Sequence, residues 1–410
     1  MGVLDVVVGR QPVFDRDLEI VGYELLFRPV ADSNSTLGEV DGDLMTSAVL
    51  FSSVSIGIDR LVGDKTVFCN ADRGLLVGSQ PIILPPERTI IEVHGSIATD
   101  PEALAGCHRL YDEGFLIALD DFTGVEGAEV MLELASMVKI DLQLVPEEDL
   151  AGLIESCRGF GVLLAAERVE TDHQLHLCRA LGFDYFQGYQ LSRPKMVPGK
   201  ALAVYSMDRL RGAKRLLDEG RGAADLLEVI ATEPAMAYQV LQMAAVGNDT
   251  STRRAIRTLR ESLVVLGARQ LENCVRLLLT TTSGVTSEDE VVAALTRARM
   301  CELLAAQIDP KLAEMAYTAG LLSSFDLLLG ISIEEALLAL PLDSELLQAC
   351  LRKPTPVGRI VADVTDYQLG RPERARRSLQ DQRAMHAAAA TALSWAVEAA
   401  RGAGAALVGS

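Results

Sequence analysis

The segment LIALDDFTG, residues 116–124, sets two aspartates side by side directly after a short apolar run. The run contains no alternating polar residues, which is typical of a strand covered on both faces in a parallel sheet. Adjacent carboxylates repel each other, so Asp120 and Asp121 need neighbouring groups that offset their charge. The end of this strand is therefore the first place to look for a functional site.

Other apolar runs of the same kind surround this segment in the first half of the chain. They are DVVVG, EIVGYELLF, KTVFCN, RTIIEV, MVKIDL, GVLLAAE and FDYFQG. Stretches with helical spacing lie between them, including DGDLMTSAVLFSSVSIG, DPEALAGCHRLYDEG and EEDLAGLIESCRGFG. About eight strands alternating with helices predict a (β/α)₈-like barrel. A doubly wound open sheet would produce the same pattern.

The segment LSRPKMVPGKAL, residues 191–202, interrupts this alternation with two prolines and a glycine. We predict a domain boundary here, with a barrel domain over residues 1–195 and a helical domain over residues 200–405. The second half has helical spacing almost throughout, and Gly267 and Gly330 stand where helices should end. No fixed repeat period occurs, which favours a compact helical bundle over a solenoid.

Composition narrows the class of protein. The chain has 410 residues, of which 49% are hydrophobic and 23% charged, as expected for a soluble protein with two cores. Its formal charge of −19 disfavours nucleic acid and anionic membranes as partners. We see no secretory signal and no apolar stretch of bilayer-spanning length, so we expect a cytoplasmic protein. The seven cysteines are scattered singly, which indicates buried thiols rather than a zinc site.

Polar residues end or interrupt strand after strand in the predicted barrel, where reactive groups collect at the carboxyl ends of the strands. They are Glu24, Asn70, Glu92, Asp120, Asp121, Lys139, Asp141, Glu167 and Gln187. Each one alone could cap a helix or form a turn. Together they offer the carboxylate and amide oxygens that Mg²⁺ or Mn²⁺ prefers. Two such ions would offset the repulsion between adjacent aspartates.

These residues resemble a known family in their order along the chain. YELLFR, residues 23–28, resembles the EAL signature of cyclic di-GMP phosphodiesterases, with Glu24 as its glutamate and Arg28 as the arginine that follows. The other matching motifs are CN with Asn70, IEV with Glu92, DDF with Asp120 and Asp121, KID with Lys139, AERVET with Glu167 and Glu170, and QGYQLSRP with Gln187 and Pro194.

The resemblance implies an EAL barrel with a two-metal site that takes Mg²⁺ or Mn²⁺. It implies that one metal is held by Glu24, Asn70, Glu92 and Asp120, and that Asp121 helps to hold the second. Lys139 and Glu167 would position or activate the attacking water, supported by Glu170. Arg28, Gln187 and Pro194 would serve substrate binding, with Arg28 on a phosphate of cyclic di-GMP.

The helical half resembles the HDOD module, a relative of HD phosphohydrolases. The likeness lies in TEPAMAYQVLQMA, IRTLRESLVVLG and AGLLSSFDLLLGISIEEALLALPL. No His-Asp dipeptide occurs in the chain, and His386 is the only histidine after residue 176. We therefore expect a non-catalytic module that regulates the barrel or binds an unidentified protein partner. The combination resembles bacterial EAL-HDOD signalling proteins.

Two functions remain open. The complete set of oxygen ligands predicts metal-dependent hydrolysis of cyclic di-GMP to linear pGpG. DDFTGVEG stands where active members of the family read DDFGTG, and EVHG, residues 92–95, stands for ELTE, with His94 as a ligand or a structural residue. These departures favour a silent barrel that serves as a cyclic di-GMP receptor or protein scaffold. Family barrels often pair, so a homodimer is possible. We predict phosphodiesterase chemistry.

Overall fold

The structure of the protein is a computed structural model. It describes residues 3–27, 42–78, 80–124, 129–202, 206–246, 255–281, 287–338, 340–371 and 379–400. The chain divides into two compact units, one formed by Val6–Gly199 and the other by the chain from Lys200 onward together with its first residues.

The first unit is a closed barrel of eight strands. The strands are β1 Val3–Phe14, β2 Ile20–Phe27, β3 Thr66–Asn70, β4 Thr89–His94, β5 Leu116–Asp120, β6 Met137–Asp141, β7 Leu163–Glu167 and β8 Tyr185–Phe186. Their order is β2-β3-β4-β5-β6-β7-β8-β1, and β1 also pairs with β2. This last pairing closes the sheet, so the barrel prediction is confirmed and the open-sheet alternative is wrong.

One strand departs from the predicted parallel sheet. Strands β2 to β8 run parallel to their neighbours, whereas β1 is antiparallel to both β2 and β8. Residues 15–19 link β1 to β2, and Asp15 Oδ1 accepts hydrogen bonds from the backbone N–H groups of Asp17 and Glu19. A link of this length forms a hairpin and is too short for the helical crossover that parallel strands require.

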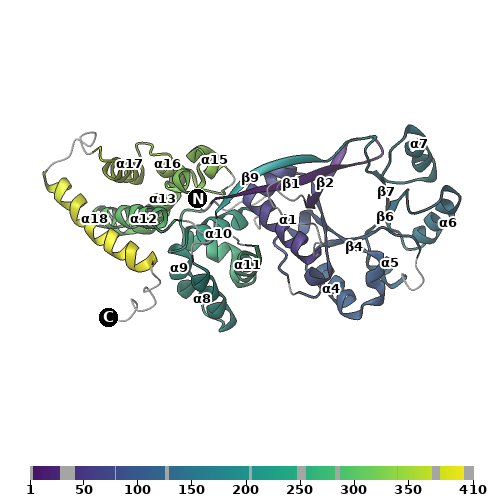
Figure 1. Ribbon diagram of the computed structural model, residues 1–410, viewed down its shortest axis with the longest axis horizontal. Helices are drawn as coiled ribbons and strands as arrows, with labels where there is room; N and C mark the ends of the chain where they lie inside the picture. The colour runs from purple at the N-terminus through teal and green to yellow at the C-terminus, as the bar shows by residue number, and fades with distance from the viewer. Residues whose placement is uncertain are drawn as a thin grey trace. The chain divides into compact units, whose positions relative to one another are not determined.

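Helices follow the strands and lie around the outside of the barrel (Figure 1). They are α1 Gly42–Ile56, α2 Ile58–Val62, α3 Arg73–Leu76, α4 Pro101–Asp112, α5 Glu129–Leu134, α6 Glu147–Arg158 and α7 Asp172–Leu181, with short 3₁₀ turns at Pro86–Arg88 and Gly95–Thr99. Local sequence sets their ends. Helix α7 starts at a capping box between Thr171 and Gln174, and stops at Gly182 in the left-handed conformation.

The predicted linker between the domains is partly a strand. Strand β9, Lys195–Leu202, follows Pro194 and pairs with β1 at the edge of the sheet order. Pro198 lies within it, and an edge strand tolerates proline because its missing N–H need not pair with another strand. The segment in which the sequence predicts a domain boundary thus contains a strand.

The second unit is helical, as predicted. Its helices are α8 Met207–Asp218, α9 Ala223–Ala231, α10 Pro234–Val246, α11 Leu259–Thr281, α12 Glu288–Ile308, α13 Ala313–Leu322, α14 Phe325–Leu329, α15 Ile333–Leu337, α16 Ser344–Cys350, α17 Pro356–Gln368 and α18 Leu379–Ala400, with a 3₁₀ turn at Pro310–Leu312. Gly330 ends α14 with a φ of 65°, and Gly267, with a φ of 70°, interrupts α11. Both glycines break helices where the sequence predicts.

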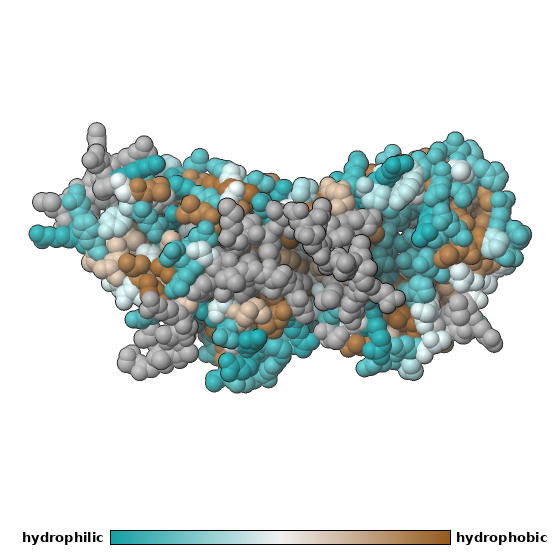
Figure 2. Space-filling model, in the orientation of Figure 1, coloured by the Kyte–Doolittle hydropathy of each residue, from teal (hydrophilic) through white to brown (hydrophobic). Residues whose placement is uncertain are grey.

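Within the described residues, one segment is long and apolar enough to cross a membrane by length and composition. It is Pro310–Leu329, and 72% of its apolar window is buried. The segment is broken into a 3₁₀ turn, α13 and α14, so here it forms core of the helical unit. All seven cysteines are free and buried, as predicted. In Figure 2, hydrophilic residues cover most of the visible surface, and hydrophobic residues show as separate patches.

Candidate metal centre

A layer of apolar side chains fills the barrel and fixes the direction of the polar residues above it. The layer consists of Val13, Phe68, Ile90, Ala118, Met137 and Ala165. Gly22 makes room for this layer, because a Cβ at that position would lie 2.6 Å from the Phe68 ring. Side chains two residues apart on a strand point to the same face. The next inward positions are Asn70, Glu92, Asp120, Lys139 and Glu167, at or near the carboxyl ends of five neighbouring strands.

The ammonium group of Lys139 lies at the centre of a cluster of carboxylates. Its Nζ lies 2.5 Å from Glu92 Oε1, 2.5 Å from Glu167 Oε1, 3.5 Å from Asp120 Oδ1 and 4.0 Å from Glu24 Oε2. The Lys139 side chain is only 1% exposed. Acidic residues from strands β2, β4, β5 and β7 therefore converge on one cation from β6, instead of being paired separately with arginines.

Two amide side chains hold Glu24 in this cluster. Asn70 Nδ2 donates to Glu24 Oε1 at 3.0 Å, and Gln187 Nε2 donates to Glu24 Oε2 at 2.5 Å. In this arrangement the amide nitrogen of Asn70 faces the carboxylate. A metal ion between them requires the amide to turn its oxygen inward, since only that atom is a ligand. Gln187 Oε1 is buried and accepts no hydrogen bond from any residue that the structure describes.

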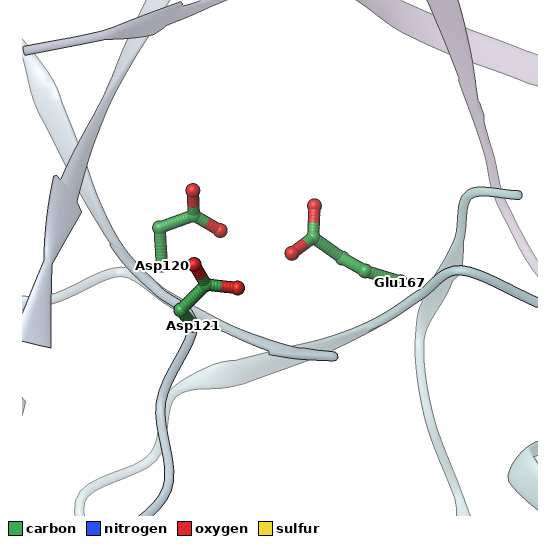
Figure 3. A group of neighbouring side chains, drawn as sticks. All are labelled: Asp120, Asp121 and Glu167. Atoms are coloured by element: carbon green, nitrogen blue, oxygen red, sulfur yellow. The ribbon is translucent and has the colours of Figure 1, made fainter. Parts of the chain in front are cut away.

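The backbone explains how two consecutive aspartates can face the same site. Successive side chains on a strand point to opposite faces, but Asp121 has a φ of 50°, in the left-handed region. Aspartate is one of the few residues that adopt this conformation readily. Carboxylate oxygens of Asp120, Asp121 and Glu167 all lie within 4.8 Å of one another. Figure 3 shows the three carboxyl groups directed toward a common space.

Burial and mutual repulsion change the proton affinities of the cluster. Burial raises the pKa of Glu167 to about 8, although Lys139 opposes the rise. Burial also raises the pKa of Glu92 well above its ordinary value. For Asp120, burial is outweighed by Lys139 and by a hydrogen bond from Glu167, so its pKa is lowered. Without metal, the cluster therefore favours the protonated form of Glu167 over that of Asp120.

The cluster has the composition of a site for hard divalent cations. Glu24, Glu92, Asp120, Asp121 and Glu167 with Lys139 carry a formal charge of −4 when ionised, which is the charge that two divalent cations neutralise. Both carboxylate oxygens of Glu92 are buried without a hydrogen-bond donor among the described residues, although Lys139 pairs with Oε1. Such oxygens are stable next to a cation and costly without one. The residues present thus fit Mg²⁺ or Mn²⁺.

Other predicted site residues lie outside this cluster. Glu170 is exposed, and its Oε1 accepts a hydrogen bond of 3.2 Å from Gln143 Nε2. Pro194 is partly buried and lies directly before β9. Arg28 and part of the DDFTGVEG loop, residues 125–127, lie outside the described residues. His94 Nδ1 accepts the backbone N–H of Ser96 at 3.2 Å, so this ring nitrogen stabilises the turn that follows β4.

Sequence reasoning left one pair of residues without a role. Asp141, at the end of β6, is buried, and its Oδ2 lies 3.0 Å from Nε of Arg168, which directly follows β7. Asp141 was noticeable as a strand-end acid. Arg168 carries one usable signal, its place next to Glu167 at the end of a strand.

Comparison with known proteins agrees with the two-domain organisation. The family model for the EAL domain matches residues 39–194, and the model for the HDOD domain matches residues 210–340. The barrel is thus an EAL domain, and the EAL match includes every site residue from Asn70 to Pro194. The chain as a whole carries an EAL domain followed by an HDOD domain, as the resemblance predicts.

Relatives with similarity to most of the chain are known. YuxH, an uncharacterized protein of Bacillus subtilis, is 27% identical over 84% of this chain and 86% of its own length. The cyclic di-GMP phosphodiesterase CdgJ of Vibrio cholerae is 27% identical over 86% of this chain and 83% of its own. The Bacillus subtilis YkuI protein, with an EAL domain, was solved in complex with substrate c-di-GMP and calcium. It matches with 24% identity and a TM-score of 0.39, over 47% of this chain and 55% of that one.

Proposed function

We propose that the EAL domain hydrolyses one phosphodiester bond of cyclic di-GMP to linear pGpG with Mg²⁺ or Mn²⁺, and that the HDOD domain is a non-catalytic module. The observation that carries the proposal is the cluster of Asp120, Asp121 and Glu167, which lies beside Lys139 at the mouth of the barrel. The name of CdgJ, a relative over 86% of the chain, supports the same substrate.

The residues of the cluster fit distinct roles. Glu24, Asn70, Glu92 and Asp120 would hold one metal ion, and Asp121 would help to hold the second. Bound divalent cations would supply Lewis-acid polarisation of the phosphoryl group and stabilise its developing charge. Arg28, Gln187 and Pro194 would serve substrate binding.

Glu167 and Lys139 fit the handling of the attacking water. Glu167 lies close to both aspartates, and its raised pKa makes it a stronger base than an ordinary carboxylate, so once ionised it would accept a proton from the attacking water. Lys139 Nζ contacts Glu167 and Glu92 at 2.5 Å and would keep both carboxylates in place. Glu170, which is linked to Gln143, would support this end of the site.

The test is a direct assay of turnover. Purified protein is incubated with cyclic di-GMP and Mn²⁺, and linear pGpG is measured by chromatography. The parent protein should produce pGpG, and Glu24→Ala and Glu167→Ala should each reduce the rate by about 10²-fold or more. Glu155→Ala, which removes an exposed acid from α6, serves as a control with the same charge change. Absence of product from the parent protein rules out the enzymatic proposal.

A specific observation favours the receptor as the second candidate. Lys139 already lies among four carboxylates, so the site has an internal counter-ion without any metal. A barrel of this kind could keep its fold after losing turnover. Calorimetry of cyclic di-GMP binding, with and without Mn²⁺, separates the candidates. Binding without product formation supports the receptor, and absence of binding leaves a protein scaffold.

For the helical half we propose a role in binding a protein partner. Across the described residues, the one group of acidic, histidine or cysteine side chains suited to a metal ion lies in the barrel. A full-length variant with Glu92→Gln and Asp120→Asn should therefore contain no stoichiometric transition metal by elemental analysis. Retention of one equivalent of metal would point to a site elsewhere and contradict a non-catalytic HDOD domain.

A further inference from the structure

A second ring of polar residues lies just beyond the metal cluster. The cluster uses Glu92, Asp120, Lys139 and Glu167 on four neighbouring strands, β4 to β7. One or two residues further along each strand stand His94, Asp121, Asp141 and Arg168. This outer ring marks the edge at which a bound ligand would enter the barrel mouth.

Arg168 is the member of this ring whose backbone is strained. Its φ is 52°, in the left-handed region, which is unfavourable for a residue other than glycine. Asp121 has nearly the same conformation, with a φ of 50°, and in both places the preceding residue belongs to the metal cluster. The left-handed residue allows two consecutive side chains to serve the barrel mouth. In Asp121 this geometry brings the carboxylate to the cluster. The same geometry in Arg168 raises the question of what its side chain binds.

Two neighbours hold the guanidinium group of Arg168. Its Nε lies 3.0 Å from Asp141 Oδ2, and its Nη1 donates to Gln143 Oε1 at 2.9 Å. Gln143 is itself fixed by its bond to Glu170. Among the described residues, Nη2 has no partner, and the Arg168 side chain is 57% exposed. The planar group is thus oriented by two contacts while one of its edges remains accessible.

A further cation at this edge would strengthen the attraction of the site for phosphate. The cluster carries a formal charge of −4, so two divalent cations would leave it neutral overall. Cyclic di-GMP carries two phosphate charges, which the bound cations would attract locally and an arginine at the edge would attract in addition. Burial raises the pKa of Asp121, and Arg168 lies close enough to oppose this rise in part. It is therefore an exposed cation close to the place where the phosphates would lie.

We propose that Arg168 binds a phosphate oxygen of the cyclic dinucleotide at the edge of the metal cluster, with Asp141 and Gln143 orienting its guanidinium group. This inference rests on the proposed function, because it names a contact to the same ligand. Arginine suits the task, since its fork binds phosphate while two of its other donors remain paired. The simpler role is neutralisation of buried Asp141, and the experiment is designed to separate the two.

The experiment measures binding of cyclic di-GMP by calorimetry in the presence of Ca²⁺. Arg168→Gly removes the side chain and suits the left-handed backbone, so the fold should be retained. We expect its affinity to fall about 10- to 100-fold, the size of a charge-assisted hydrogen bond. Arg168→Lys keeps the positive charge without the planar guanidinium fork. Its affinity for cyclic di-GMP should lie between that of the parent protein and that of Arg168→Gly. Arg158→Gln, at the far end of α6 and the opposite end of the barrel, should bind like the parent.

A double variant separates phosphate binding from neutralisation of Asp141. If Arg168 binds the phosphate, Arg168→Gly should weaken binding about equally in the parent and in an Asp141→Asn background. Equal affinity of Asp141→Asn and of the double variant would overturn the inference. Unchanged affinity of Arg168→Gly, or loss of its Mn²⁺ binding, would overturn it as well. If the parent protein neither binds nor hydrolyses cyclic di-GMP, the proposed function fails together with the inference.

Discussion

Two buried cations, one in each unit, are accommodated in opposite ways. In the barrel, Lys139 lies within 4.0 Å of four carboxylates. In the helical unit, Arg297 of α12 is 3% exposed, and its Nε and Nη1 donate to Gln368 Oε1 at 2.7 Å and to the Ser323 carbonyl oxygen at 2.8 Å. Lys139 is outnumbered by acids, whereas Arg297 is bonded to neutral acceptors.

The directions of the pKa shifts express the same difference. Burial lowers the pKa of Arg297, and the carboxylate of Asp326 only partly opposes it. Burial acts in the same sense on Lys139, but Glu167, Glu92 and the other acids outweigh it and raise its pKa. The helical unit therefore holds a buried cation that is bonded to two neutral acceptors. The barrel holds a surplus of negative charge that calls for further cations, which is the physical mark of a metal site.

Removal of Lys139 should have the largest effect. Lys139→Met leaves the carboxylates without their counter-ion, so the free energy of unfolding of the metal-free barrel should fall by about 3–5 kcal/mol. Excess Mn²⁺ should stabilise the variant more than the parent protein, because the ions replace the missing charge. The measurement is urea unfolding followed by circular dichroism, in EDTA and in Mn²⁺. Equal destabilisation under both conditions would contradict the charge argument.

Arg297→Met should have a smaller effect that does not depend on metal. The substitution leaves the acceptors of Gln368 and Ser323 unpaired, at a cost of about 2–3 kcal/mol. The single tryptophan of the chain, Trp395, lies in α18, so its fluorescence follows the unfolding of the helical unit. Arg260→Met, which breaks an exposed ion pair with Glu314, is the control and should cost less than about 1 kcal/mol. Recovery of the stability of Arg297→Met on addition of Mn²⁺ would contradict the difference between the two buried cations.

Glu92→Gln should stabilise the metal-free barrel while it weakens metal binding. The raised pKa of Glu92 means that burial disfavours its ionised form in the folded metal-free protein, a cost that glutamine avoids. We expect a gain of about 1–2 kcal/mol in EDTA and a loss of Mn²⁺ affinity by calorimetry. A destabilised variant in EDTA would show that the ion pair with Lys139 outweighs repulsion among the acids.

Much of the site could be predicted because a strand that is buried on both faces has an apolar sequence, and a polar residue at its end stands out. The two-residue spacing from Phe68 to Asn70, or from Ala118 to Asp120, is also visible in the sequence, and the barrel brings these ends together. The antiparallel β1 was missed although Asp15 supplies a turn signal before β2. Strand β9 was missed because the prolines and the glycine in its segment indicated a domain boundary.

Two features of the site could not be predicted from residue types. Lys139 was expected to act on the attacking water, and its place at the centre of four acids depends on the direction of side chains from four other strands. The left-handed backbone of Arg168 is rare for arginine, so propensity argues against it. Such conformations persist where the surrounding contacts compensate for them, here the contacts to Asp141 and Gln143.

The pH dependence of stability should be the most gradual of these effects, and its sign is specific. The pKa of Glu167 is raised from 4.5 to about 8, so between these values the folded metal-free protein holds a proton that the unfolded chain has lost. The contribution of Glu167 to stability is therefore fully present below about pH 4.5, falls as the pH rises to about 8, and is constant above. The slope should be about 1 kcal/mol per pH unit or less. The pKa of Asp120 is lowered, so its contribution to stability is lost as the pH falls through the acidic range. This change is opposite in direction to that of Glu167 and occurs only in more acidic solution.

Mn²⁺ should reverse this dependence, because the ion and the proton compete for the same carboxylates. Stabilisation of the barrel by Mn²⁺ should be larger at pH 8.5 than at pH 6, as measured by urea unfolding at both values. Glu167→Gln should flatten the profile in EDTA, since its amide does not titrate. The helical unit, followed through Trp395, should show no such dependence, because the acceptors of Arg297 are neutral. Destabilisation of the metal-free barrel on acidification from pH 8 to pH 5 would mean that Glu167 is ionised by Lys139 alone, and the metal-free cluster would then need no additional positive charge.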